Sequence, residues 1–123
     1  MIKITNKDGF IFSLKFIKVS TNKIYAGTHW TERNQLKDSY LWLLKENEFG
    51  KQVSSYPVKL KFVFCFKSKP LDASNCSYMA KMIEDGLVKL GVIKDDSYKH
   101  ISSVEYISKK GKEDIVYVRI IED

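Results

Sequence analysis

Residues 58–66, Val-Lys-Leu-Lys-Phe-Val-Phe-Cys-Phe, are the segment that most restricts the possible folds of this chain. Apolar residues alternate with lysines in its first half and fill its second half. Val and Phe favour β-strands, and a strand that is apolar on both sides usually has neighbours on both edges. We therefore predict a β-sheet in which this segment is a central strand.

Four other segments have the alternation or the composition of strands. Residues 1–4 and 10–19 are separated by Asn-Lys-Asp-Gly, a sequence typical of hairpin turns. Residues 100–108 and 115–121 are separated by Lys-Lys-Gly-Lys, which predicts a second hairpin. Residues 20–28 are polar and contain a glycine, so they are expected to form a loop.

Two segments have the periodicity of amphipathic helices. The first covers residues 31–47, with Thr31 as the expected N-cap. Its apolar stripe consists of Leu36, Tyr40, Leu43 and Leu44. The second begins at Asp72 or Ser74 and ends near Leu90, with Gly91 as its C-terminal stop. Its apolar stripe consists of Met79, Met82, Ile83, Leu87 and Leu90, and its polar face carries Ser74, Tyr78, Lys81 and Asp85.

The order β-β-α-β-α-β-β predicts an α/β (α+β) fold with a small mixed sheet and two main helices. A length of 123 residues suits a single domain over residues 1–123. Cys65 and Cys76 lie in apolar or amphipathic stretches and are expected to be buried free thiols. Because no charged-then-apolar leader and no membrane-spanning run is present, we expect a cytoplasmic protein with no membrane partner.

The charge of the chain is unevenly distributed. It has 21 Lys+Arg and 15 Asp+Glu residues, a formal net charge of +6. Residues 1–66 hold eleven of the basic and five of the acidic residues, whereas residues 67–123 hold ten of each. The net positive charge favours nucleic acid or another polyanion as partner, although a solvated lysine-rich surface would have the same composition.

Carboxylates are the candidates for catalysis, because the sequence lacks a nucleophile elbow, a phosphate-binding glycine loop and a zinc motif. Asp72 precedes the second helix, Asp85 lies one turn after Lys81, and Asp95 and Asp96 follow the helix. Carboxylates beside a lysine suit Mg²⁺-assisted phosphodiester cleavage. Taken singly, the same residues are equally typical of a helix cap, an i, i+4 ion pair and a solvated turn.

The length of the predicted second helix separates two of these carboxylates, Asp72 and Asp96. Some 17 residues of helix span about 25 Å, so Asp72 and Asp96 can meet only in a symmetric or strand-mediated arrangement.

Basic and aromatic residues are mixed in the segment 22–33, ahead of the first helix. Lys23 and Arg33 could bind phosphates, and Tyr25 and Trp30 could stack on unpaired bases. The alternative is that Tyr25 and Trp30 are core residues and His29 is a satisfied side chain.

Residues 22–37 and 71–97 together resemble the RusA-like Holliday junction resolvases of bacteria and their prophages. The first stretch runs from Asn-Lys-Ile-Tyr to Arg33 and Lys37, and the second combines Leu-Asp-Ala-Ser-Asn with Asp85-Gly-Leu and a terminal Asp-Asp-Ser. The resemblance implies a small homodimeric endonuclease that requires a divalent metal, Mg²⁺ or Mn²⁺, without a small-molecule cofactor. Such enzymes bind four-way DNA junctions and nick two strands symmetrically.

The resemblance also implies residue roles. Asp72, Asp85, Asp95 and Asp96 match the metal-site aspartates, and Lys81 matches the lysine on the helix. Ser74 departs from the family, which usually has a second aspartate in an Asp-x-Asp-Asn motif. The loss of one carboxylate should weaken Mg²⁺ binding. The residues expected to contact DNA are Lys23, Tyr25, His29, Trp30, Arg33, Lys37, Lys67, Lys69 and Asn75.

The leading hypothesis is therefore a metal-dependent endonuclease that resolves four-way DNA junctions in recombination and repair. A second hypothesis, prompted by Ser74, is a junction-binding protein that keeps the fold but has weak or no catalysis. A third is a dimeric scaffold without a role in nucleic-acid binding.

Overall fold

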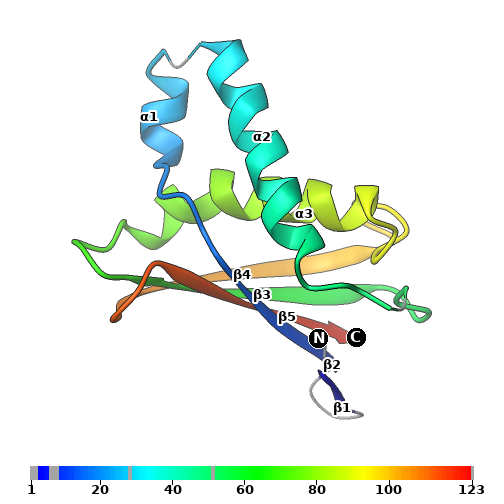
Figure 1. Cartoon of the computed structure of the whole chain (residues 1–123). Helices are drawn as coiled ribbons and strands as arrows, with labels where there is room; N and C mark the ends of the chain where they lie inside the picture. Colours follow the sequence, from blue (N-terminus) through cyan, green and yellow to red (C-terminus); the bar gives the residue numbers. More distant parts are fainter. Residues whose placement is uncertain (1–2, 6–8, 28, 51, 123) are drawn as a thin grey trace.

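The computed structural model describes residues 3–5, 9–27, 29–50 and 52–122, with the backbone alone for 3–5, 9–10 and 25. It is a mixed α+β fold, as predicted: one sheet has the helices packed on one of its faces (Figure 1). The strands are β1 (Lys3–Thr5), β2 (Gly9–Lys15), β3 (Val58–Phe66), β4 (Ile101–Lys110) and β5 (Ile115–Glu122). Their order in the sheet is β1-β2-β5-β3-β4.

The central position predicted for residues 58–66 is confirmed. β3 pairs in parallel with β4 on one edge and antiparallel with β5 on the other. Leu60, Phe62 and Phe64 are at most 1% exposed and face the helices. Burial of alternate apolar residues on this face stabilises the pairing, since each large side chain contributes about 1.5–3 kcal/mol when fully buried.

The predicted hairpin of residues 100–108 and 115–121 is wrong, because β3 lies between β4 and β5. β4 is an outer strand, reached from β3 through a helix, and the chain then passes the C-terminal end of β3 to reach β5. At this passage the Gly111 amide donates to the Phe66 carbonyl over 2.8 Å. A Cβ at Gly111 would lie 2.9 Å from the Cβ of Cys65, so a glycine suits the close approach. A turn-forming sequence predicts the turn but not which strand the chain rejoins.

The helices are α1 (Thr21–Tyr25), α2 (Trp30–Lys45) and α3 (Ser77–Lys89), with a 3₁₀ turn η1 (Ala73–Cys76) before α3. The loop predicted for residues 20–28 is wrong in part, because it contains α1. The predicted cap is also wrong: His29 is the N-cap of α2, and its Nδ1 accepts from the Thr31 amide over 3.1 Å. The predicted stop at Gly91 is confirmed by its positive φ of 77° directly after α3 and its C-cap.

The predicted apolar stripes form the core between the helices and the sheet. Tyr40 and Leu44 of α2 are fully buried, and so are Met79, Ile83 and Leu87 of α3. The other predicted stripe residues are buried or partly buried in the same core: Leu36, Leu43, Met82 and Leu90. α2 crosses α3 as Figure 1 shows.

Two further expectations concern the thiols and the membrane. Cys65 and Cys76 are free and buried, as predicted. Burial raises the pKa of the Cys76 thiol to about 11. Among the residues that the structure describes, no helix combines the length and the apolar character that a membrane crossing requires.

Candidate functional site

Thr21, at the start of α1 and directly before residues 22–37, helps to join the two segments that carry the resemblance. Its hydroxyl donates to the Asn75 carbonyl over 3.2 Å and accepts from the Tyr78 amide over 2.8 Å. It also lies 2.9 Å from the hydroxyl of Ser77. The Asn22 amide donates to Asn75 Oδ1 over 3.2 Å. The side chain of Asn75, predicted to bind DNA, is therefore engaged in holding α1 against the start of α3.

Asp72 and Ser74 are exposed at this end of α3. Asp72 occupies the N-cap position of η1, and its carbonyl accepts from the Asn75 amide over 2.9 Å. Its carboxylate makes no capping hydrogen bond. The interpretation of Asp72 as an ordinary helix cap is thus wrong for its side chain.

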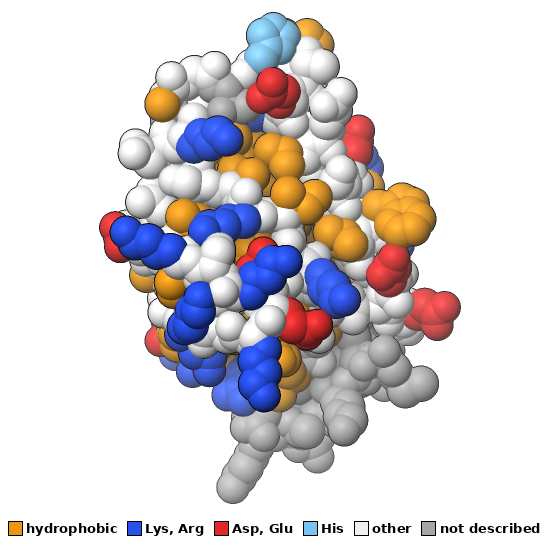
Figure 2. Space-filling view, turned by 60° about the vertical axis from the view of Figure 1, so that its left-hand side comes forward, with side chains coloured by type: hydrophobic (Ala, Val, Ile, Leu, Met, Phe, Trp, Pro, Cys, Tyr) orange, Lys and Arg blue, Asp and Glu red, His pale blue; other side chains and the backbone are white. Residues whose placement is uncertain are grey.

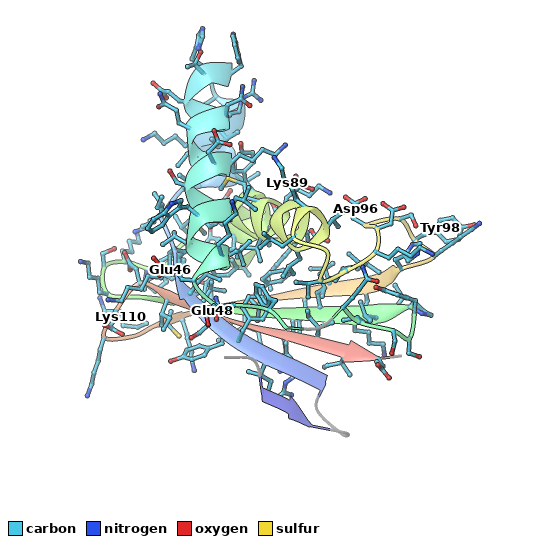
Figure 3. All side chains as sticks on the ribbon, turned by 45° about the vertical axis from the view of Figure 1, so that its right-hand side comes forward. Glu46, Glu48, Lys89, Asp96, Tyr98 and Lys110 are labelled. Atoms are coloured by element: carbon cyan, nitrogen blue, oxygen red, sulfur yellow. The ribbon has the colours of Figure 1, made fainter. Side chains whose placement is uncertain are left out.

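Four charged side chains meet beside the middle of α3, and we call them the Lys81 cluster: Lys37, Lys81, Asp85 and Asp96. Lys81 Nζ lies 2.7 Å from Asp96 Oδ2 and 3.3 Å from Asp85 Oδ1. Lys37 Nζ, from α2, lies 3.8 Å from Asp85 Oδ2. Figure 3 shows Asp96 on the connection that follows α3, on the helix side of the sheet. The i, i+4 ion pair of Lys81 and Asp85 predicted from the sequence is present. Asp96 from the connection after α3 and Lys37 from α2 join it.

The close charges change the proton affinities within this cluster. The hydrogen bond from Lys81 holds the pKa of Asp96 below its usual value. The same bond, supported by the Asp85 charge, raises the pKa of Lys81. At neutral pH both groups are therefore charged. Asp95 is exposed, and its Oδ1 accepts from the Asp96 amide over 2.8 Å, as in a turn.

Glu84 is a neighbour of this cluster that the sequence analysis missed. It is only 8% exposed, and burial raises the pKa of its carboxyl although the Lys81 charge opposes the shift. Glu84 follows Ala80 by four residues and precedes Leu87 by three, and both of these are fully buried. This spacing in the sequence places Glu84 on the buried face of the helix. A carboxyl group here rests against the core side of α3.

The structure brings together part of the predicted metal site. Asp85 and Asp96 converge on Lys81, whereas Asp72 lies before the N-terminal end of α3, outside the Lys81 cluster. Within the described residues no group of three or more His, Cys, Asp or Glu side chains is arranged for a metal. Two carboxylates are nevertheless the number with which Mg²⁺ is commonly held. Asp85 and Asp96 fit such an ion if the Lys81 ammonium moves aside.

Lysines gather where β3 and β4 end, beside Asp72, and we call this surface the basic end: Lys18, Lys67, Lys69 and Lys110. Lys18 Nζ donates to the Lys69 carbonyl over 2.7 Å, and Lys110 Nζ donates to the Ser68 carbonyl over 3.0 Å. Figure 2 looks at this side of the molecule and shows Lys and Arg side chains over its lower half. Lys67 and Lys69 were predicted as DNA contacts, whereas Lys18 and Lys110 join them only in the fold.

The first half of α2 stands clear of the sheet and carries the remaining predicted contacts (Figure 1). Trp30 is 62% exposed, so its interpretation as a core residue is wrong. The rings of His29 and Trp30 lie 5.8 Å apart at 31°. Lys23 is exposed, and Arg33 is partly buried. The side chain of Tyr25 lies outside the described residues.

A comparison of the chain with models of protein families and with curated proteins finds no match in either set.

Proposed function

We propose that the protein is a metal-dependent endonuclease that cuts branched DNA, of the kind that resolves four-way junctions, and that it acts in the cytoplasm as a homodimer. The observation that carries the proposal is the convergence on Lys81 of Asp85 and Asp96, which follow it by four and fifteen residues. The hydrogen bond from the Asn22 amide to Asn75 Oδ1 supports it, because it joins the two segments that carry the resemblance.

Asp72 completes the proposed site only if two copies of the chain pair. Asp72 precedes α3 and Asp96 follows it, and both are exposed. A two-fold axis that lays α3 antiparallel to α3 of a second copy would bring Asp72 of the partner subunit to the Lys81 cluster. Two such sites related by the axis suit paired nicks in a junction with approximate two-fold symmetry.

The roles of the residues follow from their charges. Asp85 and Asp96, with Asp72 of the partner subunit, would hold Mg²⁺ or Mn²⁺. The bound ion would supply a nucleophilic water and offset phosphate charge. Lys81, once displaced from the carboxylates, would neutralise negative charge that develops on the phosphate. Asp95 would orient Asp96 through the hydrogen bond to its amide.

The DNA backbone would be held mainly by the basic end. Its four lysines lie beside Asp72, and the exposed Lys23 lies on α1, which packs on η1 and α3. His29 and Trp30 at the tip of α2 would stack on unpaired bases at the branch point, with Arg33 behind them. Lys37 is available to phosphates once its pairing with Asp85 is released.

The test is cleavage of a synthetic four-way junction with Mg²⁺ by the wild type, Asp72→Asn and Asp96→Asn. Each variant alone should lose at least about a hundredfold in rate, since each removes one metal ligand. Glu46→Gln, an exposed carboxylate at the C-cap of α2 and outside the Lys81 cluster, is the control and should cut normally. Persistent cleavage by both site variants would overturn the metal-site assignment.

A mixture of the two inactive variants tests the composite site. A mixed dimer would contain one intact site and one doubly altered site, so single nicks should return without paired cuts. If mixing restores nothing while the wild type cuts, the site lies within one chain and the pairing of α3 helices is wrong.

A second candidate function is junction binding without cleavage. Ser74 stands where the resemblance calls for an aspartate, and Lys81 already neutralises Asp85 and Asp96. If the wild type binds junctions without cutting them and Ser74→Asp cuts, the binding function is correct. A wild type that neither binds nor cuts junctions at low salt would favour a scaffold, because phosphate contacts are strongest there.

A further inference from the structure

The sheet has a second face that none of the described helices covers. In β3 and β5 the residues that alternate with the core point away from the helices, as their burial patterns show. Val116 and Val118 are fully buried against the helices, whereas Tyr117 between them is 45% exposed. We call this the open face and define it by six of its residues: Lys15, Lys61, Val63, Lys109, Tyr117 and Arg119.

Tyr117 lies at the middle of the open face. β5 has β2 and β3 as neighbours, and Tyr117 is directly opposite Ser13 on one side and Val63 on the other. Val63 in turn lies opposite Ile107 of β4. The tyrosine ring therefore continues a short apolar row that runs across three strands. A half-exposed aromatic ring on an inner strand is a flat surface on which another ring can stack.

Cations border this apolar row on both sides. Lys61 and Arg119 are opposite one another on β3 and β5, two residues along each strand from Val63 and Tyr117. Two residues of a strand span about 6.7 Å. On the other side, Cys65 pairs with Lys109, and Ile115 pairs with Lys15. Both lysines are exposed.

The net charge of the open face selects its partner. Across β2 to β5 the described residues of this face include Lys15, Lys59, Lys61, Lys109 and Arg119, against the single carboxylate of Glu105. Two copies packed face to face would place these cations against one another, which opposes self-association through this face. A partner that supplies both anions and flat rings matches the cations and Tyr117 together.

We propose that the open face binds single-stranded nucleic acid. An unpaired base stacks on Tyr117, and the phosphates on either side contact Lys61 and Arg119 or Lys15 and Lys109. Paired bases are excluded from this mode, because a duplex does not present the flat side of a base. The proposal goes beyond the endonuclease and does not depend on it, since the Lys81 cluster lies on the helix side of the sheet.

The experiment measures binding of a fluorescent oligothymidine by anisotropy at low salt, with wild type, Tyr117→Ala and Tyr117→Phe. Because it loses the stacking ring, Tyr117→Ala should bind the oligothymidine with an affinity lower by about tenfold or more. Tyr117→Phe keeps the ring and should bind like wild type. The matched control is Tyr98→Ala, because Tyr98 is 81% exposed but lies on the connection between α3 and β4 (Figure 3). Thermal unfolding of each variant shows whether it is folded.

Salt dependence tests the phosphate contacts. Each of Lys61→Gln and Arg119→Gln should lower the slope of log affinity against log salt by about 0.7. Equal binding by wild type and Tyr117→Ala would overturn the proposal. So would preferential binding to anionic vesicles, which would identify a membrane surface as the partner.

Fluorescence of the two tryptophans locates the oligonucleotide independently. Trp30 and Trp42 are both exposed on α2, away from the open face. Binding at the open face leaves their emission unchanged, whereas the base stacking proposed above for Trp30 would quench it. Quenching together with equal affinity of wild type and Tyr117→Ala would place the oligonucleotide on α2 and overturn the proposal. Junction cleavage by Tyr117→Ala should equal that of the wild type, so failure of this inference and failure of the endonuclease proposal are distinguishable.

Discussion

The ammonium group of Lys81 lies 2.7 Å from the carboxylate of Asp96, which follows it by fifteen residues. α3 ends between the two, and the chain turns back at Gly91 to bring Asp96 beside the helix. The ion pair therefore ties the connection after α3 to the body of the helix. Its consequences for stability can be measured without any assumption about function.

The Asp96 pairing should make stability depend on pH. Lys81 holds the pKa of Asp96 below that of the unfolded chain, so the stabilisation is present above the unfolded pKa of about 3.9 and is lost as pH falls through the folded pKa. Asp96→Asn should lower the free energy of unfolding at neutral pH by up to about 1 kcal/mol, a small value because the pair is half-exposed. Urea denaturation at neutral and acidic pH measures the difference, which should disappear in acid. Asp95→Asn is the control, and an equal loss by Asp96→Asn at both pH values would contradict the prediction.

The buried Glu84 should have the opposite effect. Burial raises the pKa of Glu84 above that of the unfolded chain, so the folded state is penalised as pH rises through the folded pKa. Glu84→Gln should therefore be more stable than wild type at neutral pH and should approach it in acid. Thermal unfolding across this pH range measures both. Glu105→Gln, on an exposed strand position, should show no such trend. A less stable Glu84→Gln at neutral pH would show that the charge itself is needed.

The crossing of α2 and α3 should be sensitive at Gly86. A Cβ at Gly86 would overlap Leu44 Cδ1, and Leu44 is fully buried. Gly86→Ala should destabilise by about 1–3 kcal/mol although alanine favours helices. Gly50→Ala is the matched control, because no atom lies within 4 Å of its added Cβ. Urea denaturation compares the two, and equal stability would show that the helices can separate without cost.

Gly111 tests the strand order. The chain passes the end of β3 there, and an added Cβ would lie 2.9 Å from the Cβ of Cys65. Gly111→Ala should cost about 1 kcal/mol or more, because the backbones of both segments must shift. If β4 and β5 formed a simple hairpin, Gly111 would lie in an open turn. The substitution would then leave the free energy of unfolding nearly unchanged. Thermal unfolding against Gly50→Ala measures the difference.

Periodic burial was the part of the fold that could be predicted. The bounds of β3 matched residues 58–66, because the face of the strand that packs on the helices is apolar along its whole length. The stripes ending at Leu44 and Leu90 were found because burial against a sheet repeats with the helical period. α1 could not be found in this way, since Ile24 is the only buried side chain among those described in this short helix.

Contacts between distant segments were the part that could not be predicted. Lys81 and Asp85 were paired from their spacing, but the third partner, Asp96, required the turn after α3. The His29 cap was missed because threonine is the commoner capping residue, and the local geometry of the chain decided otherwise.

By itself, the sequence determined the α+β class, the core stripes and the candidate charged residues, because each depends on neighbours along one strand or one helix. Only the tertiary structure decided which charges meet. Asp72 precedes α3 and stays outside the Lys81 cluster, whereas the turn at Gly91 returns Asp96 to Lys81. Strand order likewise depends on which edge of the sheet the chain reaches after a crossover. That order brings Lys61 of β3 beside Tyr117 and Arg119 of β5 on one face, which no local sequence pattern could reveal.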